Sequence, residues 1–156
     1  DLEPYHPLGT GKAEKIGKVQ EFVSKIPEKD RNMIPKQVAM YHKYYPLVNA
    51  GDYYRLASYQ ENGLRDAYMV VSKDKKEALL TYVQVMMRPN CHSVIMRLKG
   101  LDAEKKYKVY RFKIESGEEE EMMPEALYGD TLMEAGLRIE NPWGDFRAML
   151  ISLREV

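Results

Sequence analysis

The residue types most able to do chemistry in this chain are three histidines and one cysteine. His6, His42 and His92 are scattered along the sequence without the spacing of a metal site. Cys91 and His92 are adjacent, which suggests a thiolate–imidazole pair. In a strand, however, neighbouring side chains point to opposite faces, so these two would not meet. We therefore interpret Cys91 as a structural cysteine, and as the only one in the chain it forms no intrachain disulfide.

Two further stretches resemble ligand sites at first reading. "LGTGKA" (8–13) suggests a phosphate loop, but that motif needs Gly at position 6 and Ser or Thr at position 13, where His6 and Ala13 stand. The acidic run Glu118–Glu121 suggests a cation site. Consecutive glutamates on a strand would alternate faces, so we interpret the run as a solvated turn. The sequence therefore predicts no cofactor and no metal.

The overall charge limits the classes of partner. Lys and Arg number 24, as do Asp and Glu, so no excess of positive charge points to nucleic acid or to an anionic membrane. No apolar run reaches the roughly 18 residues of a membrane span, and no signal peptide is visible. The single cysteine favours a reducing compartment. We predict a cytoplasmic protein with neither nucleic acid nor membrane as partner.

The first 50 residues predict helices. "KAEKIGKVQEFVSKI" (12–26) carries its apolar residues at helical spacing, and Pro27 is expected to end it. A second helix is predicted over 30–45, with Asp30 as N-cap, Pro35 in the first turns and Pro46 as the stop. Its apolar side chains lie on more than one face. This helical lead-in spans residues 1–50.

From Gly51 onward the pattern is typical of β-strands. Val94, Met96 and Leu98 alternate with Ile95 and Arg97. The strands are expected at 66–72, 77–87, 93–98, 107–114 and 146–153. Short turns separate them, with no helix between, so residues 51–156 are predicted to form an antiparallel Greek-key β-sandwich. The fold class is thus mainly β, with one or two α-helices ahead of the sandwich.

Aromatic residues gather where the helices meet the strands, and their role admits two interpretations. Five tyrosines lie there: Tyr44, Tyr45, Tyr53, Tyr54 and Tyr59. They could form a platform on which sugars stack, but we favour rings that join a helix to a sheet with hydroxyls reaching water. Trp143, in the turn "NPWGD", is similarly either an exposed binding residue or a plug against a sheet edge or a neighbouring domain. Tyr53, Tyr54 and Trp143 are the candidate sugar or interdomain contacts.

Four motifs give the chain a family resemblance. They are "YHKYYPLVNAGDYYRLAS" (41–58), "AYMVVSKDKKEALLTYVQV" (67–85), "IMRLKGLDAEKKYKV" (95–109) and "YGDTLMEAGLRI" (128–139) followed by "GDF". In this order they resemble the end of the barrel and the C-terminal domain of the α-galactosidases of glycoside hydrolase family 36. The resemblance covers about residues 30–156. It implies that residues 30–46 correspond to the last helix of a (β/α)₈ barrel, and that the source is bacterial.

The resemblance also implies structural roles. Gly51, Asp52 and Arg55 belong to the motif that enters the domain, and Gly129, Asp130 and Gly136 to the segment 128–139. That segment is too short and too glycine-rich to predict a helix from sequence, and the family uses it as a bent edge that crosses between two sheets. The two glycines would permit the bends, and Asp130 would accept local backbone N–H groups.

The catalytic residues of the family are absent. Such enzymes use two Asp residues of the barrel, one of them in a Lys-Trp-Asp motif, whereas Trp143 here stands between Pro142 and Gly144. We therefore predict no catalytic residue and a non-catalytic domain that packs against and stabilises a parent barrel, with possible homo-oligomer contacts. Galacto-oligosaccharides would be reached through the parent only. The alternative is a carbohydrate-binding module.

Overall fold

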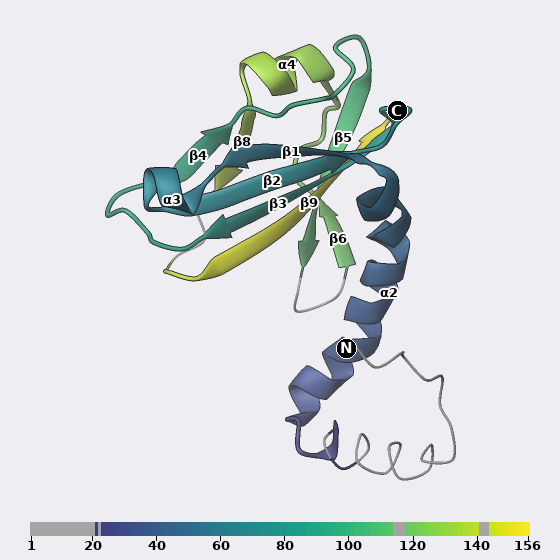
Figure 1. The fold of residues 1–156 in the computed structure, drawn as a ribbon, viewed down its shortest axis with the longest axis vertical. Coiled ribbons are helices and arrows are strands. Elements are labelled where there is room, and N and C mark those ends of the chain that lie inside the picture. The colour runs from purple at the N-terminus through teal and green to yellow at the C-terminus, as the bar shows by residue number, and fades with distance from the viewer. Residues whose placement is uncertain (1–20, 22, 114–117, 141–143) are drawn as a thin grey trace, which may run out of the picture.

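The structure is a computed structural model that describes residues 21, 23–113, 118–140 and 144–156 (Figure 1). Most of the helix expected over 12–26, and Trp143, lie outside the described residues. The elements run in the order α2 (Glu28–Ala50), β1 (Asp52–Ala57), α3 (Tyr59–Asn62), β2 (Arg65–Val71), β3 (Glu77–Gln84), β4 (Ser93–Met96), β5 (Lys106–Lys113), β6 (Glu118–Glu121), β7 (Leu127–Tyr128), α4 (Gly129–Glu134), β8 (Leu137–Glu140) and β9 (Arg147–Glu155).

The strands form two layers. The larger sheet has the order β1-β2-β3-β9-β5-β6, and β7 also pairs with β5. The last strand thus lies between β3 and β5, and all pairs are antiparallel. The second layer is the antiparallel pair β4-β8. The predicted mainly β, antiparallel sandwich with a preceding helix is confirmed.

The core between the layers is built by alternate residues of each strand. On β2, Ala67, Met69 and Val71 point inward and are fully or almost fully buried, as period-two alternation requires. The core is completed by Ala78, Leu80, Tyr82, Met96, Leu98, Leu101, Tyr107, Val109, Leu132, Leu137, Ile139, Ile151 and Leu153. Val70, between two inward residues, faces the other way and packs under α2. The large sheet therefore has an apolar patch on its outer face as well.

Helix α2 is longer than the sequence indicated. It begins at Glu28, directly after Pro27, so Asp30 lies in the first turn and is not the N-cap. The expectation that Pro46 stops the helix is wrong, because the helix continues to Ala50. The hydrogen bond that Pro46 cannot make is offset by burial of Leu47 against Val70. The next residue, Gly51, donates its N–H to the Leu47 carbonyl at 2.8 Å.

The acidic run is not a solvated turn, as the sequence suggested, but strand β6. It pairs with β5 in the register Glu119↔Phe112 and Glu120↔Arg111. Its glutamates alternate faces, and cations meet them on both: Glu120 pairs with Arg111 at 2.9 Å, and Glu121 pairs with Lys108. The positive side chains of β5 thus make a strand possible where four adjacent carboxylates would otherwise repel each other.

The segment 127–140 crosses from one layer to the other. Strand β7 pairs with β5 in the large sheet, and β8 pairs with β4 in the small one. Between them lies α4, where the sequence had excluded a helix; Leu132, buried completely, anchors this short turn in the core. Gly136 follows with φ +89°, a backbone conformation that favours glycine, and turns the chain into β8.

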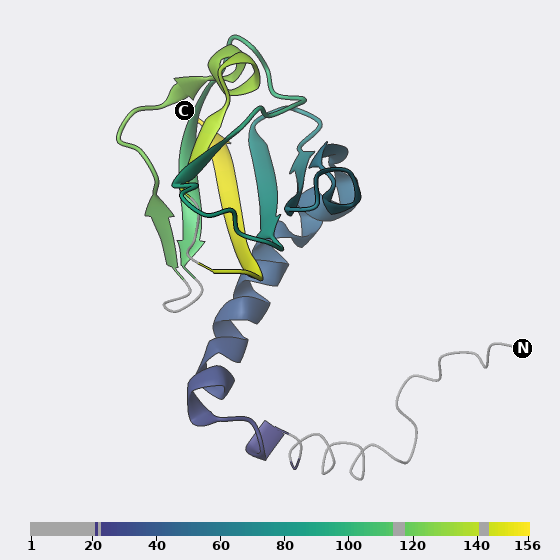
Figure 2. The same cartoon turned by 90° about the vertical axis from the view of Figure 1, so that its left-hand side faces the viewer.

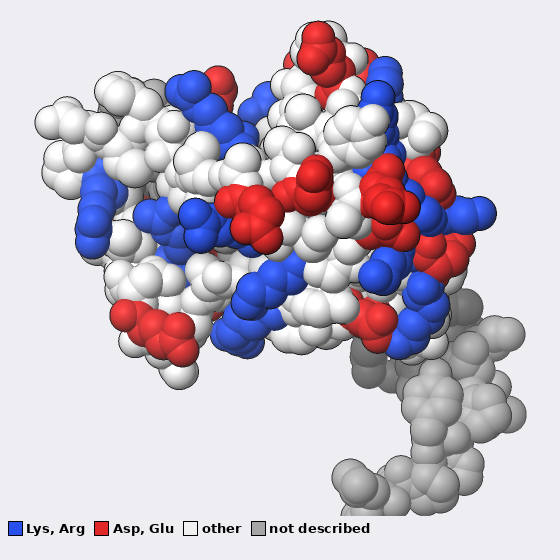
Figure 3. Space-filling model, turned by 90° about the horizontal axis from the view of Figure 1, so that it is seen from above, with Lys and Arg blue, Asp and Glu red and all other residues white. Residues whose placement is uncertain are grey.

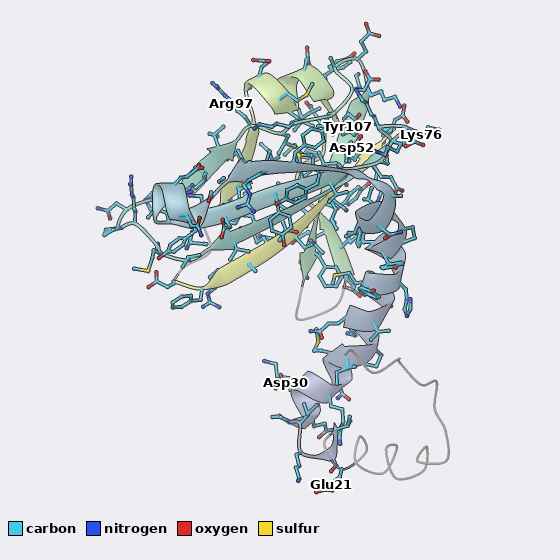
Figure 4. All side chains as sticks on the ribbon, viewed as in Figure 1. Glu21, Asp30, Asp52, Lys76, Arg97 and Tyr107 are labelled. Atoms are coloured by element: carbon cyan, nitrogen blue, oxygen red, sulfur yellow. The ribbon has the colours of Figure 1, made fainter. Side chains whose placement is uncertain are left out.

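Helix α2 does not lie wholly on the sandwich. Its C-terminal half packs on the outer face of the large sheet, and its N-terminal part extends beyond the strands (Figures 1 and 2). Asp30 lies on this extending part (Figure 4). Within the described part of the chain, no helix is long and apolar enough to cross a membrane.

Candidate functional site

Among the residues that the structure describes, His42 is not brought together with Cys91 and His92. Cys91 and His92 lie in the loop before β4, and the Cys91 thiol contacts the Ser93 carbonyl at 3.6 Å. His42 lies on α2, edge-on to the Tyr41 ring, and His6 is outside the described residues. Among the residues that the structure describes, no three His, Cys, Asp or Glu side chains are placed to hold a metal ion.

A cluster of charged and hydroxyl groups instead surrounds Glu119 of β6. The Glu119 carboxylate accepts hydrogen bonds from the Tyr44 hydroxyl and the Arg154 guanidinium, and at 3.0 Å from the Lys43 ammonium. The Ser152 hydroxyl donates to it at 3.2 Å. Three elements, α2, β6 and β9, therefore meet at one carboxylate.

Burial alone would raise the pKa of the Glu119 carboxyl, but the hydrogen bonds from Tyr44, Arg154 and Lys43 outweigh it and lower the pKa from 4.5 to about 2. The Glu119 side chain is 18% exposed, and the Arg154 guanidinium also lies 4.6 Å from the centre of the Tyr110 ring. This cluster fixes α2 on the sheet. The sequence did not predict this cluster, because Lys43, Glu119 and Arg154 are distant from one another along the chain.

Helix α2 carries two apolar stripes. Met40, Tyr44 and Leu47, spaced by four and three residues, pack on the sheet. The second set, which we call the α2 stripe, consists of Val38, Tyr41, Tyr45 and Val48 and is exposed, with Tyr41 at 58% and Tyr45 at 49%. An exposed run of large apolar side chains at helical spacing is typical of a surface that another part of a protein covers.

Two hollows lie between α2 and the outer face of the sheet, and the first of them includes residues of the α2 stripe. One is lined by Met40, Tyr41, Tyr45 and Val48 of α2 and by Leu79 and Leu150 of the sheet. The other lies under Gln37 and Met40 and is lined by Thr81, Phe112 and Ala148. Together the helix and the outer face of the sheet form an apolar corner, which we call the α2 corner.

The candidate residues of β1 lie on the sheet next to this corner. Tyr53 is 55% exposed, and its ring packs on that of Tyr68 with centroids 5.8 Å apart and planes at 32°. Arg55, on the same face of β1, reaches Asp66 at 3.8 Å. The tilt leaves no flat platform of two coplanar rings. The Tyr53 and Tyr68 rings and the exposed Arg55–Asp66 ion pair thus lie on the sheet beside the apolar α2 corner.

The five junction tyrosines do not act as one group. Tyr44, on α2, is buried between that helix and the sheet, whereas Tyr54 points to the core side of the sheet, where a Cβ on Gly100 would lie 2.3 Å from its ring. Tyr59 is partly exposed on α3. The favoured interpretation, rings that join helix to sheet, therefore applies to Tyr44 but not to the exposed Tyr45 and Tyr53.

The remaining motif residues lie at the starts of β1 and α4. The Asp52 carboxylate forms an exposed ion pair with Lys73, near the start of β1 (Figure 4). Gly129 sits where a Cβ would lie 1.9 Å from the Asp102 carbonyl oxygen, so no other residue fits without movement of the backbone. Asp130 is exposed, and its carboxylate accepts hydrogen bonds from the backbone N–H and, at 3.1 Å, the hydroxyl of Thr131.

The fold and this surface define an antiparallel β-sandwich domain with a docked N-terminal helix. Residues 65–153 match the family described as glycosyl hydrolase family 36 C-terminal domain. The α-galactosidase AgaA of Geobacillus stearothermophilus is 34% identical over 134 residues, covering 86% of this chain and 17% of that protein. The chain belongs to the family of glycosyl hydrolase family 36 C-terminal domains.

Solved structures agree with this assignment. An AgaA variant from Geobacillus stearothermophilus in complex with raffinose has a TM-score of 0.73 and 33% identity, covering 85% of this chain and 17% of that one. The α-galactosidase of Lactobacillus brevis has a TM-score of 0.74 and 27% identity, covering 86% and 18%. The chain thus spans about one sixth of the length of these relatives.

Proposed function

We propose that this chain is the C-terminal region of a family 36 α-galactosidase, and that it covers and braces the catalytic barrel of that protein. The observation that carries the proposal is the α2 stripe. Four large apolar side chains lie in water on a helix whose other stripe is already packed on the sheet. A barrel packed into the α2 corner would remove them from water, at about 25 cal/mol for each Å² of apolar surface.

The relatives support an enzyme of this class. AgaA and the Lactobacillus brevis protein are named α-galactosidases, and the AgaA variant holds raffinose. We propose that the whole protein hydrolyses terminal α-galactosyl residues of oligosaccharides in the cytoplasm, with the catalytic carboxylates on the barrel. The electrostatics of the domain fit a supporting role: in the view of Figure 3, acidic and basic side chains are interspersed over the upper face.

The chain alone is expected to be inactive. Neither carboxylate motif of the family barrel occurs in its sequence, and a retaining glycosidase needs both carboxylates across the glycosidic bond. The measurement is hydrolysis of an aryl α-galactoside by the purified chain. Turnover that follows the chain through purification and survives dilution would contradict the prediction.

The bracing role is tested by producing the chain together with the barrel region of its gene product. The complex is followed by sedimentation, with Tyr41→Asp/Tyr45→Asp as the test variant and Tyr128→Asp, an exposed tyrosine away from the α2 corner, as the control. We expect the double variant to weaken association by roughly tenfold or more, as loss of central aromatic contacts does. Equal association of all three proteins would exclude the α2 corner as the docking surface.

The carbohydrate-binding alternative rests on the exposed Tyr53–Tyr68 pair and the nearby Arg55 and Asp66. Exposed aromatic rings beside charged side chains are the chemistry that recognises a sugar, although these two rings are tilted at 32° and form no flat platform. Titration of the chain with galactose and raffinose separates the two functions. Heat of binding that disappears in Tyr53→Ala would favour the binding module over the brace.

A further inference from the structure

Phe146 is the most exposed large apolar residue among those described, at 79%, and it has an unusual backbone. Its φ is +55°, in the left-handed region. A bulky residue is rarely found there, because its Cβ crowds the following carbonyl. The exposed Phe146 ring therefore contributes little to the stability of the domain, whereas the Phe146 backbone is strained.

The neighbouring strand holds this conformation in place. The Phe146 N–H donates to the Val85 carbonyl at 3.3 Å, and the Asp145 carboxylate accepts the Met87 N–H at 2.7 Å. The buried Gln84 side chain donates to the Gly144 carbonyl at 2.8 Å. Three consecutive residues are thus fastened to the end of β3. A strained backbone conformation that neighbouring hydrogen bonds maintain suggests that the residue adopting it has a function.

The position of Phe146 relates it to the α2 corner. Ala148, two residues later, lines the hollow beneath α2, and Met86, 44% exposed, lies in the segment to which the turn is fastened. The turn that carries Phe146 therefore borders the part of the sheet face that lies beneath Gln37 and Met40 of α2. Phe146 continues the surface that the proposed function assigns to the barrel.

We propose that Phe146 is an anchor residue of this docking face, presented for insertion into an apolar pocket on the catalytic barrel of the same protein. The inference rests on the proposed function. Large aromatic side chains dominate the energetics of interfaces, and docking would offset the strain that the free domain carries. The catalytic barrel is the expected docking partner, because more than four fifths of the length of the relatives lies outside the part that this chain matches.

The first measurement uses the chain alone. Phe146→Asn replaces the ring by a residue that tolerates φ > 0. We expect the urea midpoint of the variant to rise, because the strain is relieved and little burial is lost. The control Tyr128→Asn, at an exposed tyrosine whose ring lies 4.8 Å from the Lys106 ammonium, should not raise it. A lower midpoint for Phe146→Asn would mean that the ring packs within the domain, and would overturn the proposal.

The second measurement uses the intact enzyme that carries this chain. We expect Phe146→Asn to speed heat inactivation of aryl α-galactosidase activity by roughly tenfold, opposite in sign to its effect on the domain alone. Unchanged inactivation in Phe146→Asn, with faster inactivation in Tyr41→Asp, would overturn the anchor but leave the proposed function. Unchanged inactivation in both would overturn the docking face itself. A Phe146-dependent dimer of the chain that persists in the intact enzyme would assign the anchor to a second copy and also overturn the proposal.

Discussion

At the residue scale, Glu119 is the carboxylate that accepts hydrogen bonds from both Lys43 and Tyr44 of α2 and so ties the helix to the sheet. Replacing it by Gln keeps the shape but removes the charge that Arg154 and Lys43 meet. We expect Glu119→Gln to lower the free energy of unfolding by roughly 1–3 kcal/mol, allowing for the water that reaches the cluster. The measurement is a urea titration. Glu121→Gln, which loses only a surface ion pair with Lys108, is the control and should cost less than about 1 kcal/mol.

The same carboxylate predicts a pH dependence. Its pKa is lowered in the folded state to about 2 from its ordinary value of 4.5. A lowered folded-state pKa means that the stabilisation is fully present above about pH 4.5 and is lost as the pH falls towards 2. The wild-type protein should therefore lose stability over this window more steeply than Glu119→Gln. Parallel curves for the two proteins would show that the charge of Glu119 does not stabilise the fold.

Asp130 is exposed and stabilises only its own turn. The sequence led us to expect that Asp130 accepts local backbone N–H groups, and it does accept that of Thr131. Because the carboxylate is in water and bonds only Thr131, we expect Asp130→Ala to cost about 1 kcal/mol or less, part of it from the charge at the start of α4. Any galactose binding should be unchanged. Urea midpoints and titration calorimetry test both points, and a lost affinity at an unchanged midpoint would assign Asp130 to a sugar site.

At the scale of elements, the crossing segment depends on close approach at Gly129. A methyl group there would meet the Asp102 carbonyl oxygen at 1.9 Å, so the backbone must move. We expect Gly129→Ala to destabilise the sandwich by roughly 2–4 kcal/mol. Gly63→Ala is the control: Gly63 has a positive φ, +67°, which Gly129 does not, but nothing lies within 4 Å of the added group, so about 1–2 kcal/mol is expected. A loss at Gly129 no larger than that at Gly63 would show that the close approach to Asp102 does not constrain the crossing segment.

The sequence predicted these elements where one periodicity dominates. Strands β2, β3, β4, β5 and β9 were predicted to within a few residues, because apolar residues alternate in them and turns separate them. The sequence-based prediction failed where contacts with residues distant along the chain determine the secondary structure. Helix α2 passes Pro46 because Leu47 is buried on β2 and β3, and Glu118–Glu121 forms a strand because Arg111 and Lys108 face it. Neither partner is visible from the local sequence.

The candidate site was predicted less completely than the fold. The sequence singled out tyrosines at the junction, and Tyr53 is exposed on the sheet face as a contact residue should be. It gave no sign that Tyr44 and Tyr45, adjacent in sequence, divide between the Glu119 cluster and the exposed α2 stripe. That division follows from the rotation of α2 on the sheet, about 100° for each residue, and only the packed structure fixes the phase.

At the scale of the whole molecule, the α2 stripe predicts how the isolated chain behaves. Val38, Tyr41, Tyr45 and Val48 are not covered by the described part of the chain, and the protein carries no net charge to keep copies apart. We expect the chain to self-associate at micromolar concentrations through this stripe, because two such helices can bury each other's apolar faces. Sedimentation velocity across a concentration series measures it. Tyr41→Asp/Tyr45→Asp should return the chain to a monomer, whereas Tyr128→Asp should not. A wild-type chain that remains monomeric at every concentration would contradict the prediction that the α2 stripe drives self-association.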